Sequence, residues 1–323
     1  MSLTSDEEID SSESEDEVSK VAHNLRDELI MSETSSSSDY WRKTAFVLST
    51  AAFAGTLPPP PMNEELEPID YFFSMVDKKS IALLTDQSNL SVLQTNPSKP
   101  QLNRTDPNFD RAHKVRPLLN IVKENFIKTD KEEKLSVGEQ IIPFKGKSIM
   151  KQHMPNKPNR WGYKMFLLAG GESGICYDFI LYAGKSDKQE YGFCTNIVLD
   201  LCATVPRAIN HKVYCDNYFT TIRLQVELKK LGIYTVGTVK PNRLTDLTMK
   251  NKKELSSEDR GAMDHRIAEV DGVTLCVTRW YDNNVVNCLS TLHDCEPLYP
   301  AERWSSQQKK TYTNCKTECY KNL

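Results

Sequence analysis

The strongest constraint on the fold of this chain is the order in which strand-like and helix-like patterns follow one another in its middle part. Apolar runs at 163–171 and 175–184, joined through Gly-Glu-Ser, predict an antiparallel hairpin. The hairpin is followed by a helix, a strand, a second helix and a second strand, at residues 195–205, 211–216, 218–232 and 233–239. Strands and helices in this order predict a mixed α/β core.

Weaker patterns flank this core. Apolar residues at helical spacing predict a helix over 113–126, and two strand-like runs on either side of Asn283-Asn284 predict a second hairpin. Asn217 is a candidate N-cap for the helix that follows it. Three polar stretches are expected to lack extended regular structure, apart from one short helix in the first of them: residues 63–106, 243–261 and 297–323.

Charge divides the chain unevenly. Residues 1–39 carry 12 acidic and 2 basic side chains, whereas residues 40–323 carry 32 acidic and 39 basic ones, so the net charge of −3 conceals an acidic tract. The tract has too few apolar residues to offset the entropy of ordering, and we expect it to be disordered. Two interpretations stay open for it, a solvating leader and a segment that binds a basic protein partner.

We expect a soluble protein in a reducing compartment. The apolar run Thr44–Leu57 is shorter than the ~20 residues that a membrane-spanning helix needs, and it lies too far along the chain for a secretory signal. Four prolines at 58–61 then predict a stiff linker. The nine cysteines are scattered and odd in number, which favours free thiols. Cys315 and Cys319 could form half of a zinc site or share that spacing by coincidence.

Asp216 stands where a strand-like run meets a helix-like run. A carboxylate at the C-terminal end of a central strand faces the crevice where α/β sheets hold ligands, and oxygen is the ligand atom that Mg²⁺ prefers. Two or three such acids would make a two-metal site for phosphoryl transfer, which one acid alone cannot do. A solvated or helix-capping aspartate is the alternative interpretation.

A basic stretch at 144–164 contains no acidic residue and interleaves aromatic side chains among its cations. Such a surface could neutralise DNA phosphates and stack on bases, while an ordinary solvated loop is the alternative. The predicted DNA contacts in this stretch are Lys145, Lys147, Lys151, Arg160, Trp161 and Lys164.

Taken together, these stretches resemble the piggyBac transposase family, especially its transposon-derived, host-adopted members. The resemblance rests on five collinear blocks, which are EPIDYF (67–72), HKVRPLLNIVKENF (113–126), LSVGEQIIPFKGKSIMKQHMPNKPNRWGYKMF (135–166), YCDNYFTTIRLQVELKKLGIYTVGTVKPNR (214–243) and WYDNNVVNCLST (280–291). It implies an incomplete RNase H-like mixed sheet core with a β-rich insertion. It also implies DNA cutting and joining at three metal-binding aspartates.

Only part of that catalytic set is matched here. Asp216 matches the second acid, whereas glycines in MFLLAGGESG stand at the place of the first, with Glu172 and Asp178 as nearby candidates. The family's Asp-Glu pair upstream has become Gly138-Glu139, and no segment matches the one that carries the third acid. Loss of one metal carboxylate usually abolishes two-metal catalysis, so we expect no strand transfer.

The resemblance implies a nuclear protein that keeps DNA binding and has lost catalysis, with double-stranded DNA as its partner. The alternatives are a residual Mg²⁺- or Mn²⁺-dependent nuclease in which Asp178 or Glu172 joins Asp216, and a protein-interaction scaffold. The sequence leaves the oligomeric state open. The expected domains are a disordered tail with its Pro linker at 1–62, a remnant of the helical DNA-binding region at 63–112, the transposase-like domain at 113–296 and an irregular tail at 297–323.

Overall fold

Two compact units make up the part of the chain that the computed structural model describes. The continuous unit is Gly55–Ser186, and the split unit combines the residues up to Ala54 with those from Asp187 onward. The described residues are 41–46, 52–56, 68–93, 110–155, 157–184, 190–244, 246–258, 260–293, 298–305 and 309–317. The acidic tract, the four prolines and Cys319 lie outside them.

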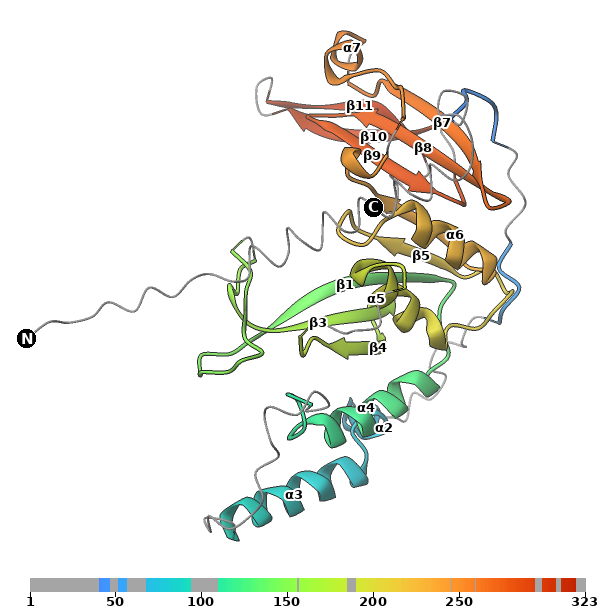
Figure 1. Cartoon of the computed structure of the whole chain (residues 1–323). Coiled ribbons are helices and arrows are strands. Elements are labelled where there is room, and N and C mark those ends of the chain that lie inside the picture. The colour runs from blue at the N-terminus through green and yellow to red at the C-terminus, as the bar shows by residue number, and fades with distance from the viewer. Residues whose placement is uncertain are drawn as a thin grey trace, which may run out of the picture. The chain divides into compact units, whose positions relative to one another are not determined.

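The continuous unit packs helices against an antiparallel sheet (Figure 1). Its elements are α2 (Pro68–Met75), α3 (Lys78–Leu93), α4 (Arg116–Lys128), β1 (Lys134–Pro143), β2 (Gln152–His153), β3 (Trp161–Gly170) and β4 (Cys176–Leu181). Strand β3 pairs antiparallel with β1, β2 and β4. The predicted hairpin at 163–184 is therefore confirmed as β3 and β4, and buried Phe166 and Leu168 place β3 in the core of this unit.

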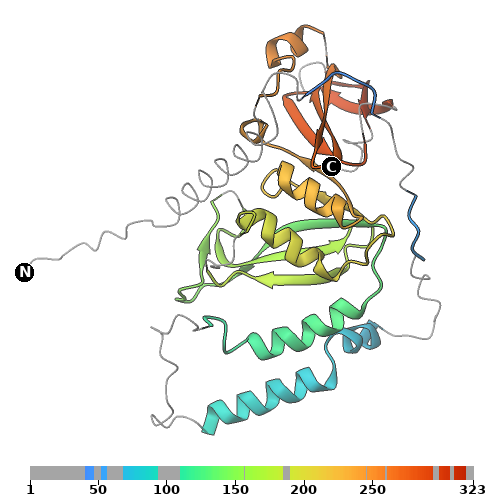
Figure 2. The same ribbon diagram turned by 45° about the vertical axis from the view of Figure 1, so that its right-hand side comes forward.

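Helix α4 confirms the helix predicted over 113–126, and its apolar face lies against β4. Phe126 meets Phe179 edge to face, with ring centroids 5.8 Å apart. Helices α3 and α4 run side by side in both views (Figure 2). We expected one short helix between residues 63 and 106, whereas two helices form there, α2 and α3. The signal for α3 was Asp77, whose carboxylate accepts the backbone N–H of Ser80 at 2.9 Å.

The split unit holds a mixed sheet in the order β5-β6-β9-β8-β7. Strands β5 and β6 run parallel, and the later neighbours run antiparallel. Its elements are α5 (Phe193–Leu201), β5 (Lys212–Cys215), α6 (Ile222–Lys230), β6 (Tyr234–Thr238), α7 (Lys252–Ser257), β7 (Met263–Val270), β8 (Val273–Tyr281), β9 (Val285–Ser290), β10 (Leu298–Ser305), β11 (Lys310–Thr317) and the 3-10 turns η1 (Cys202–Thr204) and η2 (Pro241–Arg243). The predicted mixed α/β fold and the second hairpin, β8 with β9, are confirmed.

Three expectations for the split unit were wrong. Thr221, not Asn217, caps α6, since its side chain accepts the N–H of Leu224 at 3.0 Å. The polar stretch at 243–261 contains α7, which a capping box between Asn251 and Glu254 begins. The chain beyond 297, expected to be irregular, forms the antiparallel pair β10 and β11.

Strand β7 was also absent from the predicted elements, because Asp264, His265 and Arg266 interrupt its apolar pattern. In the structure it pairs with β8 over eight residues, and Ile267, Ala268 and Val270 are buried. No helix in the described ranges combines the length and apolar character needed to cross a lipid bilayer.

Candidate functional site

The basic stretch forms a folded-back connection between β1 and β3. Pairing of β2 with β3 sets His153 opposite Trp161, and the two rings stack with centroids 4.3 Å apart. The Lys151 ammonium lies 5.0 Å from the centroid of the Trp161 ring, a cation–π distance. Phe144 stacks on Tyr163 at the base of the connection, at 4.8 Å. These contacts give the connection a fixed shape despite its loop-like composition.

Most of the predicted phosphate contacts lie on the surface of this connection. Lys145, Lys147 and Arg160 are exposed, Lys151 is half-buried, and the Trp161 side chain keeps 52 % of its area exposed. One aromatic ring and several cations are thus presented together, an arrangement suited to a nucleic-acid strand.

Lys164 differs from the other predicted contacts because it is buried. Its ammonium lies 2.8 Å from Oε2 of Glu139, and the same carboxylate lies 3.3 Å from the ammonium of Lys157. Burial acts to raise the pKa of Glu139, but the hydrogen bond from Lys164 and the charges of both lysines hold that pKa below its ordinary value. The pair joins β1 to β3 beneath the basic connection, so Lys164 supports that surface from inside.

Asp216 follows β5 directly, as predicted, and its side chain is exposed. One carboxylate oxygen accepts the N–H of Tyr218 at 2.8 Å, and the backbone carbonyl of Asp216 accepts the Thr220 hydroxyl at 2.8 Å. The aspartate thus shapes its own turn. The contact is an Asx-type turn and not a helix cap, since Thr221 caps α6, and it leaves the other carboxylate oxygen on the surface.

Arg243 holds the Asp216 loop from beneath, a role that the sequence did not indicate. Its Nη1 donates to the backbone carbonyls of Asn217, Tyr218 and Thr220 at 3.2, 3.1 and 2.8 Å, and its side chain is buried. Gly237 lets the loop pack directly against β6. A Cβ at this position would overlap the Thr220 hydroxyl and lie 2.9 Å from the Cys215 carbonyl oxygen. Both residues stand in the block YTVGTVKPNR, which was the available signal.

The two nearby candidate acids are engaged in ion pairs. Asp178 is buried in β4, where Oδ1 lies 2.8 Å from the Lys123 ammonium and accepts the N–H of Phe179 at 2.6 Å. Its Oδ2 has no hydrogen-bond partner among the described residues. Glu172 is exposed in the turn after β3 and pairs with Lys134 at 3.0 Å.

Glu132 lies against Gly170, one of the glycines in MFLLAGGESG, although nothing in its local sequence indicated a role. Its carboxylate accepts the backbone N–H of Glu172 at 3.1 Å, the Tyr177 hydroxyl at 3.2 Å and the Ser173 hydroxyl. A Cβ built on Gly170 would overlap this carboxylate. Gly170 therefore leaves room for a carboxylate whose hydrogen-bonding capacity is used by the turn after β3 and by Tyr177.

These acids do not fit a two-metal centre. Asp178 and Glu172 are each paired with a lysine, and the Glu132 carboxylate accepts hydrogen bonds from the turn after β3 and from Tyr177 in β4. No group of three or more histidine, cysteine, aspartate or glutamate side chains is placed to hold a metal in the described part of the chain. Asp216 keeps one carboxylate oxygen on the surface.

Comparison with known proteins agrees with the resemblance seen in the sequence. The protein family described as Transposase IS4 matches residues 93–321. Human PiggyBac transposable element-derived protein 3 is 32 % identical over 212 residues, which cover 64 % of this chain and 35 % of that protein. Human PiggyBac transposable element-derived protein 2 is 29 % identical over 205 residues, covering 62 % and 34 %.

Among solved structures, a piggyBac transposase synaptic complex with hairpin DNA, determined by cryo-EM, matches 61 % of this chain and 40 % of its own, with 22 % identity and a TM-score of 0.47. The chain spans about a third of the length of the two human relatives.

Proposed function

The chain belongs to the piggyBac transposase family, and from this premise we propose that it is a transposase-derived nuclear protein that binds double-stranded DNA without cutting it. In this proposal the mixed sheet is the remnant of an RNase H-like core. The single observation that carries the proposal is the shaped basic connection between β1 and β3, where cations and a half-exposed Trp161 lie together.

DNA binding is assigned to four cations. Lys145, Lys147, Lys151 and Arg160 contact phosphates, and Trp161 provides an aromatic surface beside them. Lys164 has an indirect role, because its ammonium is committed to Glu139 inside the unit. Such binding is mostly electrostatic, so it releases counterions and weakens as salt rises.

The test is a fluorescence-anisotropy titration of a labelled DNA duplex with the full chain at several salt concentrations. Changing the four cations together to Ala should weaken binding. It should also reduce the slope of log K against log salt by up to about 0.9 for each phosphate that the variant no longer neutralises. Lys164 stays unchanged in this variant, because its loss would disturb the fold.

A matched control removes the same charge elsewhere. Lys114, Arg207, Lys252 and Lys253 are exposed and lie outside both the basic connection and residues 63–112, and their combined change to Ala also lowers the net charge by four. The control should keep most of the wild-type slope. Equal losses in both variants would show that net charge alone drives binding, and the assignment to the basic connection would then be wrong.

The absence of cleavage rests on the acids. If Mg²⁺ or Mn²⁺ bound at Asp216, it would supply charge stabilisation for phosphoryl transfer. The other acids are held elsewhere: Asp178 is buried against Lys123, Glu172 pairs with Lys134, and the Glu132 carboxylate accepts the Glu172 N–H. Supercoiled plasmid incubated with the chain and either ion should therefore stay intact. Nicking that requires Mn²⁺ and disappears in Asp216→Ala would contradict this part and establish the nuclease alternative.

A further inference from the structure

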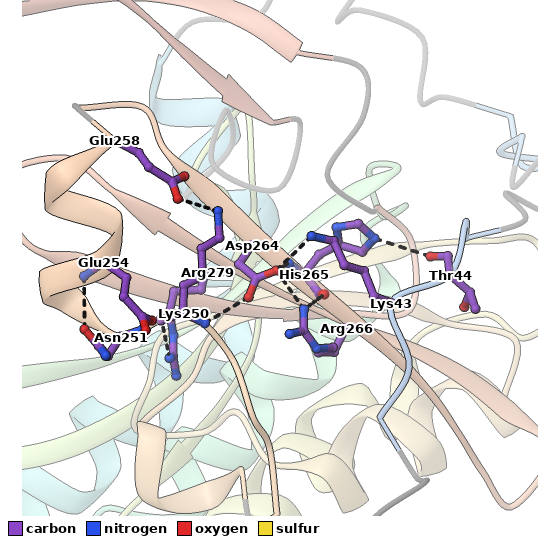
Figure 3. Close-up of polar contacts among 10 residues, drawn as sticks. All are labelled: Lys43, Thr44, Lys250, Asn251, Glu254, Glu258, Asp264, His265, Arg266 and Arg279. Carbon is purple, nitrogen blue, oxygen red and sulfur yellow. Dashed lines mark hydrogen bonds and ion pairs between the residues drawn. The ribbon is translucent and has the colours of Figure 1, made fainter.

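Residues 41–46, here called the strap, lie along the outer edge of β7 (Figure 3). Arg42 and Ile267 exchange both backbone hydrogen bonds, each 2.8 Å long. Trp41 is buried in the same apolar cluster as Val270 and Leu275. The strap therefore adds one antiparallel β-bridge and one aromatic anchor to the last strand in the sheet order of the split unit.

Polar and ionic contacts hold the residues of the strap that follow Trp41. The Lys43 ammonium lies 3.7 Å from Oδ1 of Asp264, whose side chain is only 1 % exposed, while that of Lys43 is 61 % exposed. Arg266 donates to the same oxygen at 2.7 Å. The Nε2 of His265 lies 3.3 Å from the Thr44 carbonyl oxygen. Figure 3 shows Lys43 and Thr44 reaching these groups from one side.

The edge of β7 thus recognises three features of the strand laid on it. The Ile267 backbone pairs with an extended chain, the apolar cluster takes an aromatic side chain, and Asp264 faces a cation two residues further on. This is strand addition, in which backbone hydrogen bonds supply affinity and alternate side chains supply specificity. The preferred ligand is an extended segment with the pattern aromatic, any residue, then Lys or Arg.

The chain's own connectivity points to a second copy as the source of that segment. The strap does not join β7 through a tight turn, because the whole of Gly55–Ser186 intervenes and folds as a separate unit. A strap from another copy offers identical interactions, so exchange of this element between copies gives up none of them. We propose that the outer edge of β7 is a strand-docking site through which two copies of this chain exchange straps.

The docking site can be tested with a labelled peptide of residues 39–46, DYWRKTAF, and full-length chain. In Trp41→Ala the chain's own strap loses its anchor and leaves the β7 edge open to the peptide. If the wild-type strap occupies the β7 edge in roughly nine-tenths of the molecules, the peptide should bind the variant about tenfold more tightly than wild type. A peptide with its tryptophan changed to alanine should lose binding. Arg42→Pro, which removes the N–H donated to Ile267, provides a second chain with a loosened strap.

Absence of peptide binding to both variants, with far-UV circular dichroism and cooperative melting like those of wild type, would overturn the docking site. Binding that ignores the tryptophan of the peptide would overturn it as well. These outcomes are independent of DNA binding, because the strap and the basic connection use different residues.

Exchange between copies is tested by sedimentation of full-length wild-type chain over a range of concentrations. The dimer fraction should rise with concentration, fall when excess peptide is added, and disappear in Trp41→Ala. A chain that binds the peptide yet stays monomeric throughout would overturn the exchange. A dimer unaffected by the peptide would overturn it too.

Discussion

The carboxylate of Glu132 fills the space that a side chain at Gly170 would need. Gly170 ends β3, and Glu132 reaches it from the segment before β1. The turn after β3 and Tyr177 of β4 both donate to the Glu132 carboxylate, which holds it beside Gly170. Placing an acid at position 170 therefore requires a second substitution that makes room for it.

Gly170→Asp should destabilise the chain by about 1–3 kcal/mol, since the new side chain overlaps Glu132. Adding Glu132→Ala should recover part of that loss, a coupling of about 1 kcal/mol in a double-mutant cycle measured by urea unfolding. Gly138→Asp is the matched control, because a Cβ at Gly138 meets nothing within 4 Å. Additive effects at positions 132 and 170 would contradict the overlap.

Arg243→Ala should cost about 2–4 kcal/mol of unfolding free energy, because the carbonyls of the loop after Asp216 lose a buried charged donor. Hydrogen exchange should show the largest increase at the amides of Tyr218 and Thr220. Arg207→Ala is the control, since Arg207 is exposed and, within the described ranges, its side chain contacts only the Ala203 carbonyl, at 3.5 Å. Unchanged exchange in the loop would show that Arg243 does not hold it.

Lys164→Ala should cost about 3 kcal/mol, because Glu139 then keeps a charge near β1 without its closest partner. Combining it with Glu139→Gln should remove much of that cost. If the basic connection binds DNA, the double variant should keep the salt slope of wild type, since neither residue contacts phosphate. A salt slope reduced by the equivalent of one phosphate would show instead that Lys164 contacts DNA directly.

Acid should destabilise the split unit through Asp264. Burial acts to raise its pKa, but the Lys250 N–H, the Arg266 guanidinium and the Lys43 charge outweigh it and hold that pKa below the ordinary value. A folded-state pKa below the unfolded one gives stability that is present above the unfolded value, about 3.9, and is lost as pH falls through the folded value. Thermal melts between pH 7 and pH 2 should show a smaller acid loss in Asp264→Asn. Equal losses would exclude this carboxylate as a cause.

The sequence predicted the parts of the fold whose patterns are local. The hairpin of β3 and β4, the helix α4 and the α/β alternation around Asp216 all follow from apolar spacing and turn residues. Strand β7 was missed because its charged residues interrupt the apolar pattern, and the partner that satisfies buried Asp264 from outside the strand, the Lys250 N–H, cannot be read from spacing along β7.

The candidate site also contains residues that local sequence indicated and residues that it did not. Composition indicated the exposed cations of the basic connection, but not the burial of Lys164, which depends on Glu139 from the neighbouring strand. Glu132 was invisible because its partners lie 40 to 45 residues further along the chain. Interactions that depend on distant pairing cannot be obtained from local pattern.

The strap also affects how the protein is made. Arg42 and its partner Ile267 are 225 residues apart, the difference between their numbers. At ~5–20 residues per second, a ribosome takes roughly 11–45 s to deliver β7 after the strap has been synthesised. During that interval Trp41 has no β7 to cover it, so the nascent chain presents an aromatic anchor that chaperones, or the finished edge of a neighbouring copy on the same messenger RNA, can capture first.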